Sequence, residues 1–454
     1  MKRHTFPHGI HPPELKHLTE SKDIETVPAP ETLVIPLHQH FGKPAKPLVE
    51  KGDDIFLGQK IAESDGLFSA SVHSSVSGKV KSIDPFSHPG GSPVPAVTVI
   101  NDGEDRTDSK ILKKEMSLEE VARLSSKEIL EKVKEAGVVG MGGAAFPTAV
   151  KLNPPSDKPI DCFILNGCEC EPMLTADDRL MQKYPHEIIK GAELACKATG
   201  AKRIIIGIED NKKKAYALFC QQVKNCPSIF LSESERPFRE VALLKTKYPQ
   251  GAEKNLIYAL LKREVPRGGL PFDVGTVVQN VATSKAIWDA VSRNRPLYER
   301  IVTVSGSGVN ETKNVSVRIG TPIYHVLDFC GGIKEDANLL IIGGPMMGIV
   351  QWTTDVPVIK GTSGIITWKV SQAPLEFSCI RCSRCVDHCP MRLVPTQLAK
   401  LVKYDHLSEA ESWGILDCVE CGSCQYICPS KIPLVQWLRL GKTKIISKKR
   451  KKSA

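Results

Sequence analysis

The sequence lacks any long apolar run. The longest such stretch, residues 339–350, is interrupted by glycines and is too short to cross a bilayer. The N-terminal residues carry positive charge but no apolar segment of the kind found in signal peptides, so we expect no signal peptide. These absences argue against a membrane-spanning chain, and a hydrophobic content of 41% is ordinary for a protein with a folded core.

The cysteine pattern also lacks what a disulfide framework needs. The chain has 15 cysteines, and eight of them fall in two short runs near the C-terminus. The remaining seven are an odd number without regular spacing, which argues against paired disulfides and for a reducing compartment. At 454 residues, the chain is long enough for about three or four domains.

The two cysteine runs are the most informative feature that is present. Both read C-x2-C-x2-C-x3-C-P, the spacing that binds two [4Fe–4S] clusters in bacterial ferredoxins, where the fourth cysteine of each run usually ligates the other cluster. Structural zinc also uses C-x2-C pairs, but it rarely takes three cysteines this close, twice over. We therefore predict one cluster on Cys379, Cys382, Cys385 and Cys428, and a second on Cys418, Cys421, Cys424 and Cys389.

The formal net charge of +10 is concentrated at the C-terminus. Residues 441–454 hold seven lysines and arginines, and we expect this basic tail to be disordered. The tail could be merely solvated, or it could be attracted to an anionic membrane surface. Charge alone would also allow nucleic-acid binding, but no recognisable nucleic-acid module accompanies it, so we expect no nucleic-acid partner.

The N-terminal part divides into an arm and a β domain. Residues 1–30 are proline-rich and predict an extended, ordered arm or linker, and residues 31–110 contain short β-rich runs at Thr32–Leu37, Ile55–Ala62, Gly78–Ile83 and Ala96–Ile100. This β domain resembles the barrel-sandwich fold of biotinyl and lipoyl carrier domains. Carrier domains have a lysine at a hairpin tip, where this chain has Asp65-Gly66, so we expect a structural or docking role and no swinging arm.

Residues 111–300 alternate between strand and helix patterns. Ser117 and Glu120 form a capping box that opens a helical run to Ala136. The alternation predicts an open α/β layer with a largely parallel sheet. The expected elements are strands Cys162–Leu165 and Arg203–Ile208 and helices Pro185–Thr199 and Gln279–Arg293.

The rest of the chain predicts three further segments. Residues 301–350 form a β-grasp-like pattern, with a hairpin of Ile301–Ser305 and Asn314–Ile319, a helix Pro322–Phe329 and a strand Leu339–Ile342. Residues 351–372 are expected to be connecting strands. Residues 373–440 are expected to be a helical two-cluster ferredoxin domain, with a helix at Thr396–Val402 between its halves.

Two polar segments suggest a ligand site in the α/β domain. The glycine loop, Gly140–Thr148, offers clustered backbone N–H groups that suit a phosphate, although a glycine-rich loop alone is more often only a turn. The acidic turn, Asn166–Pro172, follows a strand at the sheet edge where ligands bind in open α/β folds. Its two glutamates could be solvated or could bind ribose hydroxyls, and Cys168 and Cys170 are better explained as small packed side chains than as metal ligands.

These segments together resemble the NADH-binding flavoprotein subunit of respiratory complex I. The resemblance rests on GMGGAAFPT in the glycine loop, NGCECEP in the acidic turn, the segment Tyr248–Glu253, and Gln279–Thr283. It implies a Rossmann-like domain that binds FMN and NAD(H), with hydride and electron chemistry carried by the cofactors and no catalytic side chain. The residues implied to hold FMN are Gly140, Gly142, Lys151, Asn166, Glu169, Asn280 and Thr283, and those implied to lie near NAD(H) are Gly143, Phe146, Glu171 and Glu253. Gly251 is also implied to bind a cofactor.

The order of modules along the chain is similar to that of RnfC, the C subunit of the Rnf electron-transport complexes. The N-terminal arm motif, Gly9–Lys16, precedes the barrel-sandwich, flavin, β-grasp and two-cluster modules in that order. The resemblance implies a peripheral, NAD-reactive subunit on the cytoplasmic side of the inner membrane. Its implied partners are the other subunits, both integral membrane and ferredoxin-like, and these move Na+ or H+ while this chain exchanges electrons between ferredoxin and NAD.

Three other interpretations share parts of this pattern. A soluble electron-input subunit, such as a cobalamin reductase, can be built from the same modules. A non-catalytic electron-wiring protein would keep the cysteine runs without binding flavin. A nucleic-acid-associated iron–sulfur protein would rest on the basic tail alone. The arm motif and the module order favour the Rnf interpretation.

Overall fold

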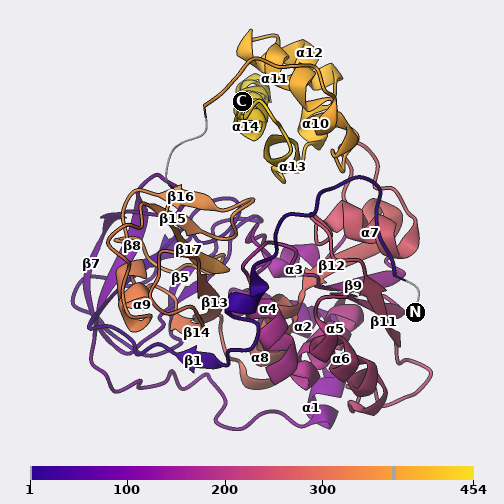
Figure 1. The fold of residues 1–454 in the computed structure, drawn as a ribbon. Helices are drawn as coiled ribbons and strands as arrows, with labels where there is room; N and C mark the ends of the chain where they lie inside the picture. The colour runs from indigo at the N-terminus through magenta and orange to yellow at the C-terminus, as the bar shows by residue number, and fades with distance from the viewer. Residues whose placement is uncertain (1–2, 371–374, 454) are drawn as a thin grey trace.

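The computed structural model describes residues 3–370 and 375–453, without the side chains of residues 452 and 453. Figure 1 shows a β-rich body beside an α/β body, with the helical C-terminal domain above them. The N-terminal arm runs along the α/β body and passes beneath the C-terminal domain. The arm is ordered as predicted: His4 pairs with Leu244, Ile10 pairs with Tyr248, and a short 3-10 helix η1 (Lys16–Leu18) follows. No helix in the described part of the chain is long and apolar enough to cross a bilayer.

The N-terminal β domain consists of two small sheets packed around Leu33, Ile35, Ile61 and Val97. The β-rich run Ile55–Ala62 contributes to two strands, because a turn at Gly58 (φ +80°) divides it between the two sheets. One sheet has the order β2 (Thr32–Pro36), β8 (Val94–Asn101), β7 (Gly78–Phe86) and β4 (Asp54–Ile55); the other has β3 (Lys46–Pro47), β5 (Lys60–Glu63) and β6 (Val72–His73).

The α/β domain is built on a four-stranded sheet in which every pair is parallel, as predicted. Its strand order is β11 (Phe238–Leu244), β10 (Arg203–Glu209), β9 (Cys162–Gly167) and β12 (Thr276–Asn280). The central strands contain continuous apolar runs at residues 162–165 and 204–208, as expected for a parallel sheet covered by helices on both faces. The helices are α1 (Leu118–Arg123), α2 (Ser126–Glu135), α3 (Thr148–Lys151), α4 (Ala176–Lys183), α5 (Pro185–Thr199), α6 (Lys213–Asn225), α7 (Glu253–Leu261) and α8 (Val281–Arg293), with a 3-10 turn η2 (Pro271–Val274).

The predicted helical run from Ser117 to Ala136 is interrupted. The capping box of Ser117 and Glu120 forms as predicted and starts α1, but a second capping box of Ser125 and Glu128 starts α2. Ser125 has an extended backbone (ψ 160°) so that its hydroxyl can accept from the Glu128 N–H, and this ends the first helix. The helical pattern did not reveal this break, because the buried residues Val121, Ile129 and Val133 keep a helical spacing across it.

The β-grasp region forms part of a larger, six-stranded sheet. Its order is β1 (Ile24–Thr26), β14 (Lys313–Arg318), β13 (Glu299–Ser305), β17 (Gly364–Trp368), β15 (Leu339–Ile342) and β16 (Ile349–Gln351), with α9 (Ile323–Phe329) packed against it. The arm supplies the edge strand β1. A short strand forms within residues 351–370, as expected, and this strand, β17, pairs with both β13 and β15 in the middle of the sheet.

The C-terminal domain is a small helical unit with two similar halves. Its elements are α10 (Arg384–Asp387), α11 (Pro395–Lys403), α12 (Leu407–Ser412), η3 (Ile415–Asp417), α13 (Ser423–Tyr426) and α14 (Leu434–Ser453). The expectation of a disordered tail is wrong, because α14 continues to Ser453. Leu434, Leu438 and Ile445 are buried in the domain core, and lysine and arginine have good helix propensity, so the anchored helix continues through the basic segment.

Candidate functional site

The glycine loop is an open turn whose outer part has free backbone donors. The Gly140 N–H donates to the Phe146 carbonyl (2.8 Å), so it is engaged within the loop and cannot also bind a ligand. Gly142, Gly143 and Ala144 are exposed, and within the described chain their N–H groups have no hydrogen-bond partner. Gly143 has φ +119°, a conformation that favours glycine. Three adjacent free N–H groups form a potential anion-binding nest.

The N-terminus of α8 supports this loop. Thr283 Oγ1 accepts from the Met141 N–H (2.8 Å), and Asn280 Oδ1 accepts from the Ala282 N–H (2.8 Å) as the helix cap. Asn280 also donates to Asp177 (2.6 Å). A Cβ on Gly142 would lie 3.5 Å from the Asn280 side chain. Of the two side chains expected to contact FMN, Thr283 therefore holds the glycine loop against α8, and Asn280 caps the helix.

The acidic turn lies at the carboxyl end of β9, as predicted. Asn166 donates to the Gly251 carbonyl (2.9 Å) and accepts from the Cys168 N–H (3.1 Å), so its amide is engaged in shaping the turn. Glu169 accepts from the Asp177 N–H (2.7 Å) and the Asp178 N–H (3.2 Å) at the start of α4. Burial raises the pKa of Glu169 to about 7, which Lys16 opposes.

Lys16 is a functional residue that sequence reasoning left without a role. It comes from the N-terminal arm, is only 7% exposed, and donates from Nζ to three carbonyls: those of Glu169 (2.8 Å), Glu171 (3.0 Å) and Leu174 (2.6 Å). Burial lowers the pKa of the Lys16 ammonium. The arm therefore fastens the acidic turn. The only available signal was its position at the end of the arm motif.

Glu171 presents a buried carboxylate at the end of the acidic turn. Its Oε2 accepts from the Met346 N–H (3.0 Å), whereas its Oε1 is buried without a hydrogen-bond partner. Burial raises the pKa of this carboxyl to about 7. A Cβ on Gly344 would lie only 2.3 Å from Glu171 Oε2, so the loop after β15 closely approaches this carboxylate. Buried polar atoms are nearly always paired, so an unpaired one needs an explanation such as a ligand or a water.

The remaining predicted residues lie along the same edge. Lys151 and Glu253 form an ion pair, and both side chains are partly exposed. Gly251 packs against both cysteines of the acidic turn, because a Cβ there would lie 3.3 Å from Cys168 Cβ and 3.4 Å from Cys170 Sγ. Burial raises the pKa of Cys170 to about 12 and that of Cys168 well above its usual value, so both thiols stay protonated. Packed, protonated thiols agree with the structural interpretation of this pair.

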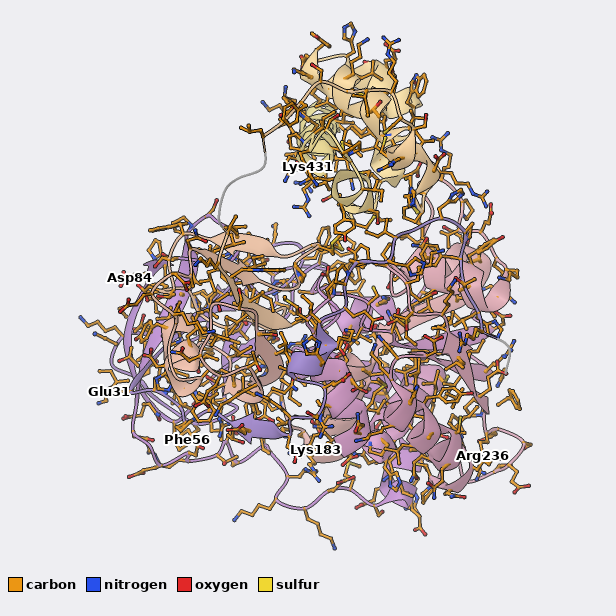
Figure 2. The ribbon with its side chains drawn as sticks, in the orientation of Figure 1. Glu31, Phe56, Asp84, Lys183, Arg236 and Lys431 are labelled. Carbon is orange, nitrogen blue, oxygen red and sulfur yellow. The ribbon has the colours of Figure 1, made fainter. Side chains whose placement is uncertain are left out.

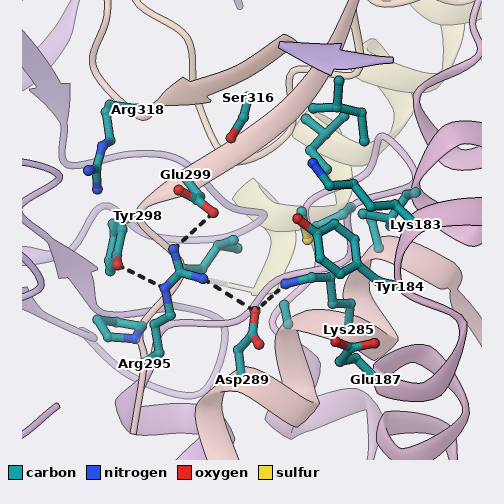
Figure 3. Close-up of a pocket in the computed structure, with 18 of the residues that line it drawn as sticks. Lys183, Tyr184, Glu187, Lys285, Asp289, Arg295, Tyr298, Glu299, Ser316 and Arg318 are labelled. Carbon is teal, nitrogen blue, oxygen red and sulfur yellow. Dashed lines mark hydrogen bonds and ion pairs between the residues drawn. The ribbon is translucent and has the colours of Figure 1, made fainter. Parts of the chain in front are cut away.

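A separate cavity of about 300 Å³ lies on the other side of α8. Figure 3 shows its charged side chains pairing with one another: Arg295 bonds to Glu299 (2.9 Å), and Lys285 bonds to Asp289 (2.6 Å). Met141 and Ala282 also line this cavity, so it borders the glycine loop. Arg295, which also pairs with Asp289 (3.9 Å), links α8 to β13.

The two cysteine runs adopt the same local conformation. Positive φ angles occur two and four residues after the first cysteine of each run, at Arg381 and Ser383, and again at Glu420 and Gly422. These turns aim backbone donors at sulfur: the Arg381 N–H lies 3.4 Å from Cys379 Sγ, and the Glu420 N–H lies 3.3 Å from Cys418 Sγ. Hydrogen bonds to sulfur are a means by which proteins tune iron–sulfur clusters.

Cys389 of the first run lies beside cysteines of the second run. One small, mostly apolar cavity is lined by Cys389, Cys418, Cys421 and Cys424. In the other set, burial and then repulsion from Cys428, Cys379 and Cys382 raise the pKa of the Cys385 thiol. Among the described residues, no group of three or more side chains converges as a single metal ion would require. A cubane instead takes one thiolate for each iron, and the ligand assignment stays a prediction.

The second cysteine run touches the α/β site. The Tyr248 hydroxyl donates to the Cys421 carbonyl (2.7 Å), and Tyr248 is only 1% exposed. Ile10, Tyr248 and Cys421 form one buried cluster, against which Cys170 and Met346 pack. The arm, the acidic turn, the β15 loop and the cluster domain thus meet at one point. By contrast, Cys379 and Cys382 are exposed at the outer side of their domain.

Four family models match successive parts of the chain. They are described as the RnfC barrel sandwich hybrid domain (residues 4–104), the Nuo51 FMN-binding domain (133–289), the SLBB domain (301–350) and the 4Fe-4S dicluster domain (375–429). They bear out the expected fold classes of the β, β-grasp and cluster modules, and they support FMN and [4Fe–4S] clusters as cofactors.

Two relatives resemble the chain along nearly its whole length. The C subunit of the proton-translocating ferredoxin:NAD(+) oxidoreductase complex of Clostridium ljungdahlii is 46% identical, over 96% of this chain and 93% of the relative. The C subunit of the Na(+)-translocating ferredoxin:NAD(+) oxidoreductase complex of Acetobacterium woodii is 42% identical, over 99% of both chains.

This chain belongs to the RnfC family. Among solved structures, a chain of an NAD+-reducing [NiFe]-hydrogenase superposes with a TM-score of 0.50 and 21% identity, covering 65% of this chain and 57% of that one. At this identity the similarity concerns the fold alone. The family explains why the four modules follow one another in this order.

The site fits the two kinds of cofactor. Free N–H groups at Gly142 to Ala144 suit a phosphate, and the unpaired Glu171 Oε1 suits a polar ligand group at the same sheet edge. The cysteine-lined cavity and the N–H groups aimed at sulfur suit a cluster. Of the implied FMN residues, Gly140, Asn166, Glu169 and Asn280 already have protein partners for the groups described, so they shape the site more than they face it.

Proposed function

We propose that this chain is the NAD(H)-reactive flavin and iron–sulfur subunit of an ion-translocating ferredoxin:NAD+ oxidoreductase complex. The observation that carries the proposal is the junction at Tyr248, where the edge of the candidate flavin site contacts the second cysteine run. A site for a two-electron donor that directly adjoins a cluster domain is what transfer between NAD(H) and single-electron carriers needs.

FMN would lie in the α/β domain, which we take to be Rossmann-like. Bound there, FMN would exchange hydride with NAD(H) and single electrons with iron–sulfur clusters. The N–H groups of Gly142, Gly143 and Ala144 would bind its phosphate, with Lys151 nearby as a cation. Lys151 is already paired with Glu253, so it would hold a ligand only by sharing or exchanging that carboxylate.

The chain's own side chains would orient ligands rather than act as acid or base. Thr283 fixes the glycine loop to α8, and Asn280 caps that helix, so the donors of the loop are preorganised. Lys16 fixes the acidic turn, which presents Glu171 at the sheet edge. The Glu171 carboxyl would accept a hydrogen bond from the dinucleotide, and this would satisfy the oxygen that now has no partner.

The two clusters would connect the flavin site with partner subunits. The four-cysteine set around Cys421 adjoins Tyr248, whereas the set around Cys382 reaches the surface. We infer that the integral membrane and ferredoxin-like subunits of the complex are partners, and that the chain is peripheral on the cytoplasmic side. The basic end of α14 would then lie near anionic lipid. Two relatives named for different ions support the same subunit role and leave the coupling ion open.

The deciding experiment is an anaerobic NADH titration of the full chain with reconstituted clusters and FMN. We expect flavin bleaching, followed by the EPR signals of reduced clusters, with about one FMN and eight irons per chain. As a control, a Tyr248→Phe variant keeps the packing but loses the hydroxyl donor to Cys421, and it should still bleach the flavin. Clusters without bound flavin, and no response to NADH, would leave an electron-wiring protein and refute the proposal.

A further inference from the structure

The barrel-sandwich domain presents exposed aromatic side chains beside the glycine loop. Phe41 is 54% exposed and Phe68 is 44% exposed, although both belong to a domain with an apolar core of its own. Their rings lie 6.2 Å apart, and each lies 5.8 Å from the ring of Phe146 in the glycine loop. Three rings from two domains thus form one exposed aromatic patch. Clustered exposed apolar side chains of this kind commonly mark a binding site.

The backbone holds Phe41 and Phe68 in place. The Phe41 N–H donates to the Ala145 carbonyl of the glycine loop (3.0 Å), and the Lys43 N–H donates to the Phe68 carbonyl (3.0 Å). Gly42 lies between them with φ +109°, and a Cβ there would lie 1.8 Å from the Phe68 carbonyl oxygen. The close approach of the two loops therefore requires glycine at this position, and the ring positions follow from the fold.

Histidines on the same segment add to this support. His38 donates from Nε2 to the Gly42 carbonyl (3.0 Å), and His40 donates from Nε2 to the Lys43 carbonyl (2.7 Å). Burial lowers the pKa of His40 to about 4, so its ring is neutral at physiological pH. Two imidazoles and the glycine loop thus hold this turn, and they fix the position of Phe41.

We propose that Phe41 and Phe68 of the barrel-sandwich domain complete, with Phe146, an aromatic platform for the adenine ring of NAD(H). The platform adjoins the free N–H groups of Gly142 to Ala144. The adenine ring could therefore stack on the aromatic side chains while its attached phosphates accept hydrogen bonds from these N–H groups. The rings are about half exposed, which suits a substrate that must leave after each turnover better than a resident flavin. This inference rests on the proposed function and gives the barrel-sandwich domain a role in it.

The platform also explains the altered hairpin tip. Asp65-Gly66 occupies the place where carrier domains have their lysine; here Asp65 pairs with Lys46 (3.4 Å), and Phe68, two residues beyond Gly66, meets the glycine loop. The tip thus contacts a fixed site instead of carrying a mobile group.

The test measures binding of ADP-ribose, the adenine-containing part of NAD, to the full chain loaded with FMN and clusters. We expect Phe41→Ala and Phe68→Ala each to raise the Kd of ADP-ribose about 10-fold, because the loss of one stacking ring costs about this much. Phe68→Tyr should leave the Kd within about 3-fold, because tyrosine keeps the aromatic ring. FMN content and cluster EPR signals should not change. Phe56→Ala is the matched control, since Phe56 lies in the same domain (Figure 2), is 40% exposed, and contacts Arg106 rather than the glycine loop.

The outcomes separate this inference from the proposed function. Wild-type chain that responds to NADH, with an ADP-ribose Kd unchanged in the alanine variants, would overturn the aromatic platform alone. So would a loss of FMN in those variants, or a loss of association with partner subunits at unchanged ADP-ribose affinity. Wild-type chain that shows no response to NADH would overturn the proposed function, and the platform with it.

Discussion

Replacing Lys16 with methionine tests whether the arm fastens the acidic turn. Methionine keeps much of the side-chain volume but removes the ammonium and its three hydrogen bonds to the carbonyls of Glu169, Glu171 and Leu174. Each buried carbonyl left without a partner costs about 1–3 kcal/mol. Removing the buried charge returns several kcal/mol of desolvation cost. We therefore expect a net loss of about 3 kcal/mol in the local stability of the turn.

Hydrogen–deuterium exchange reports this local opening, whereas global unfolding of a multidomain chain does not give one free energy. A loss of about 3 kcal/mol should speed exchange at residues 167–175 by about 100-fold and weaken FMN binding. Lys22→Met is the control, because Lys22 is an exposed arm lysine whose ammonium donates to the Thr312 carbonyl (2.6 Å) rather than to the acidic turn. Equal exchange at residues 167–175 in both variants would refute the fastening role.

Three further predictions concern other contacts. Cys428→Ser should remove the cluster of the first run and Cys389→Ser that of the second, so each variant should retain about half the iron, with different EPR spectra; loss of the cluster of its own run in either variant would reject the crossed assignment. Burial lowers the pKa of Lys360 to about 7, so between about pH 7 and pH 10 the unfolded chain holds a proton that the folded chain lacks. The stability of the wild type relative to Lys360→Met should therefore rise with pH across that interval. A difference in Tm that stays constant with pH would contradict this prediction. Replacing the lysines and arginines of residues 448–451 with glutamine should weaken binding to anionic vesicles by about 1 kcal/mol per residue at low salt, and binding that is unchanged would remove the membrane-surface proposal.

Local patterns predicted the parts of this protein that depend on short stretches of chain. The cysteine spacing, the capping box at Ser117 and the helix Pro185–Thr199 closed by Gly200 each follow from residues close in sequence, and the last two form as predicted. The features that were not predicted came from long-range packing. The place of β17 in the middle of a sheet is decided by its partners β13 and β15, and the basic tail is helical because the residues before it are packed in the cluster domain.

The site itself shows the same limit. The glycine loop and the acidic turn could be found from the sequence, because each is formed by consecutive residues of a recognisable type. Lys16 and Tyr248 could not be assigned roles, since each acts on a segment more than 150 residues away in sequence. Phe41 and Phe68 appear in the sequence as ordinary apolar residues of a β domain. Only the folded chain places their rings beside Phe146.

The contribution of separate modules also accounts for a departure in the glycine loop. Met141 stands where the resembling complex I flavoprotein has an arginine, so the loop carries no cation of its own at that position. Arg300, from β13, is buried beneath the loop and donates to the Met141 carbonyl (2.6 Å) and to the Thr362 carbonyl (2.8 Å). Burial lowers the pKa of this guanidinium to about 10, which leaves it charged at neutral pH. The strand β13 therefore supplies a fixed positive charge under the glycine loop, and we expect anion binding at the loop to depend on how β13 packs beneath it.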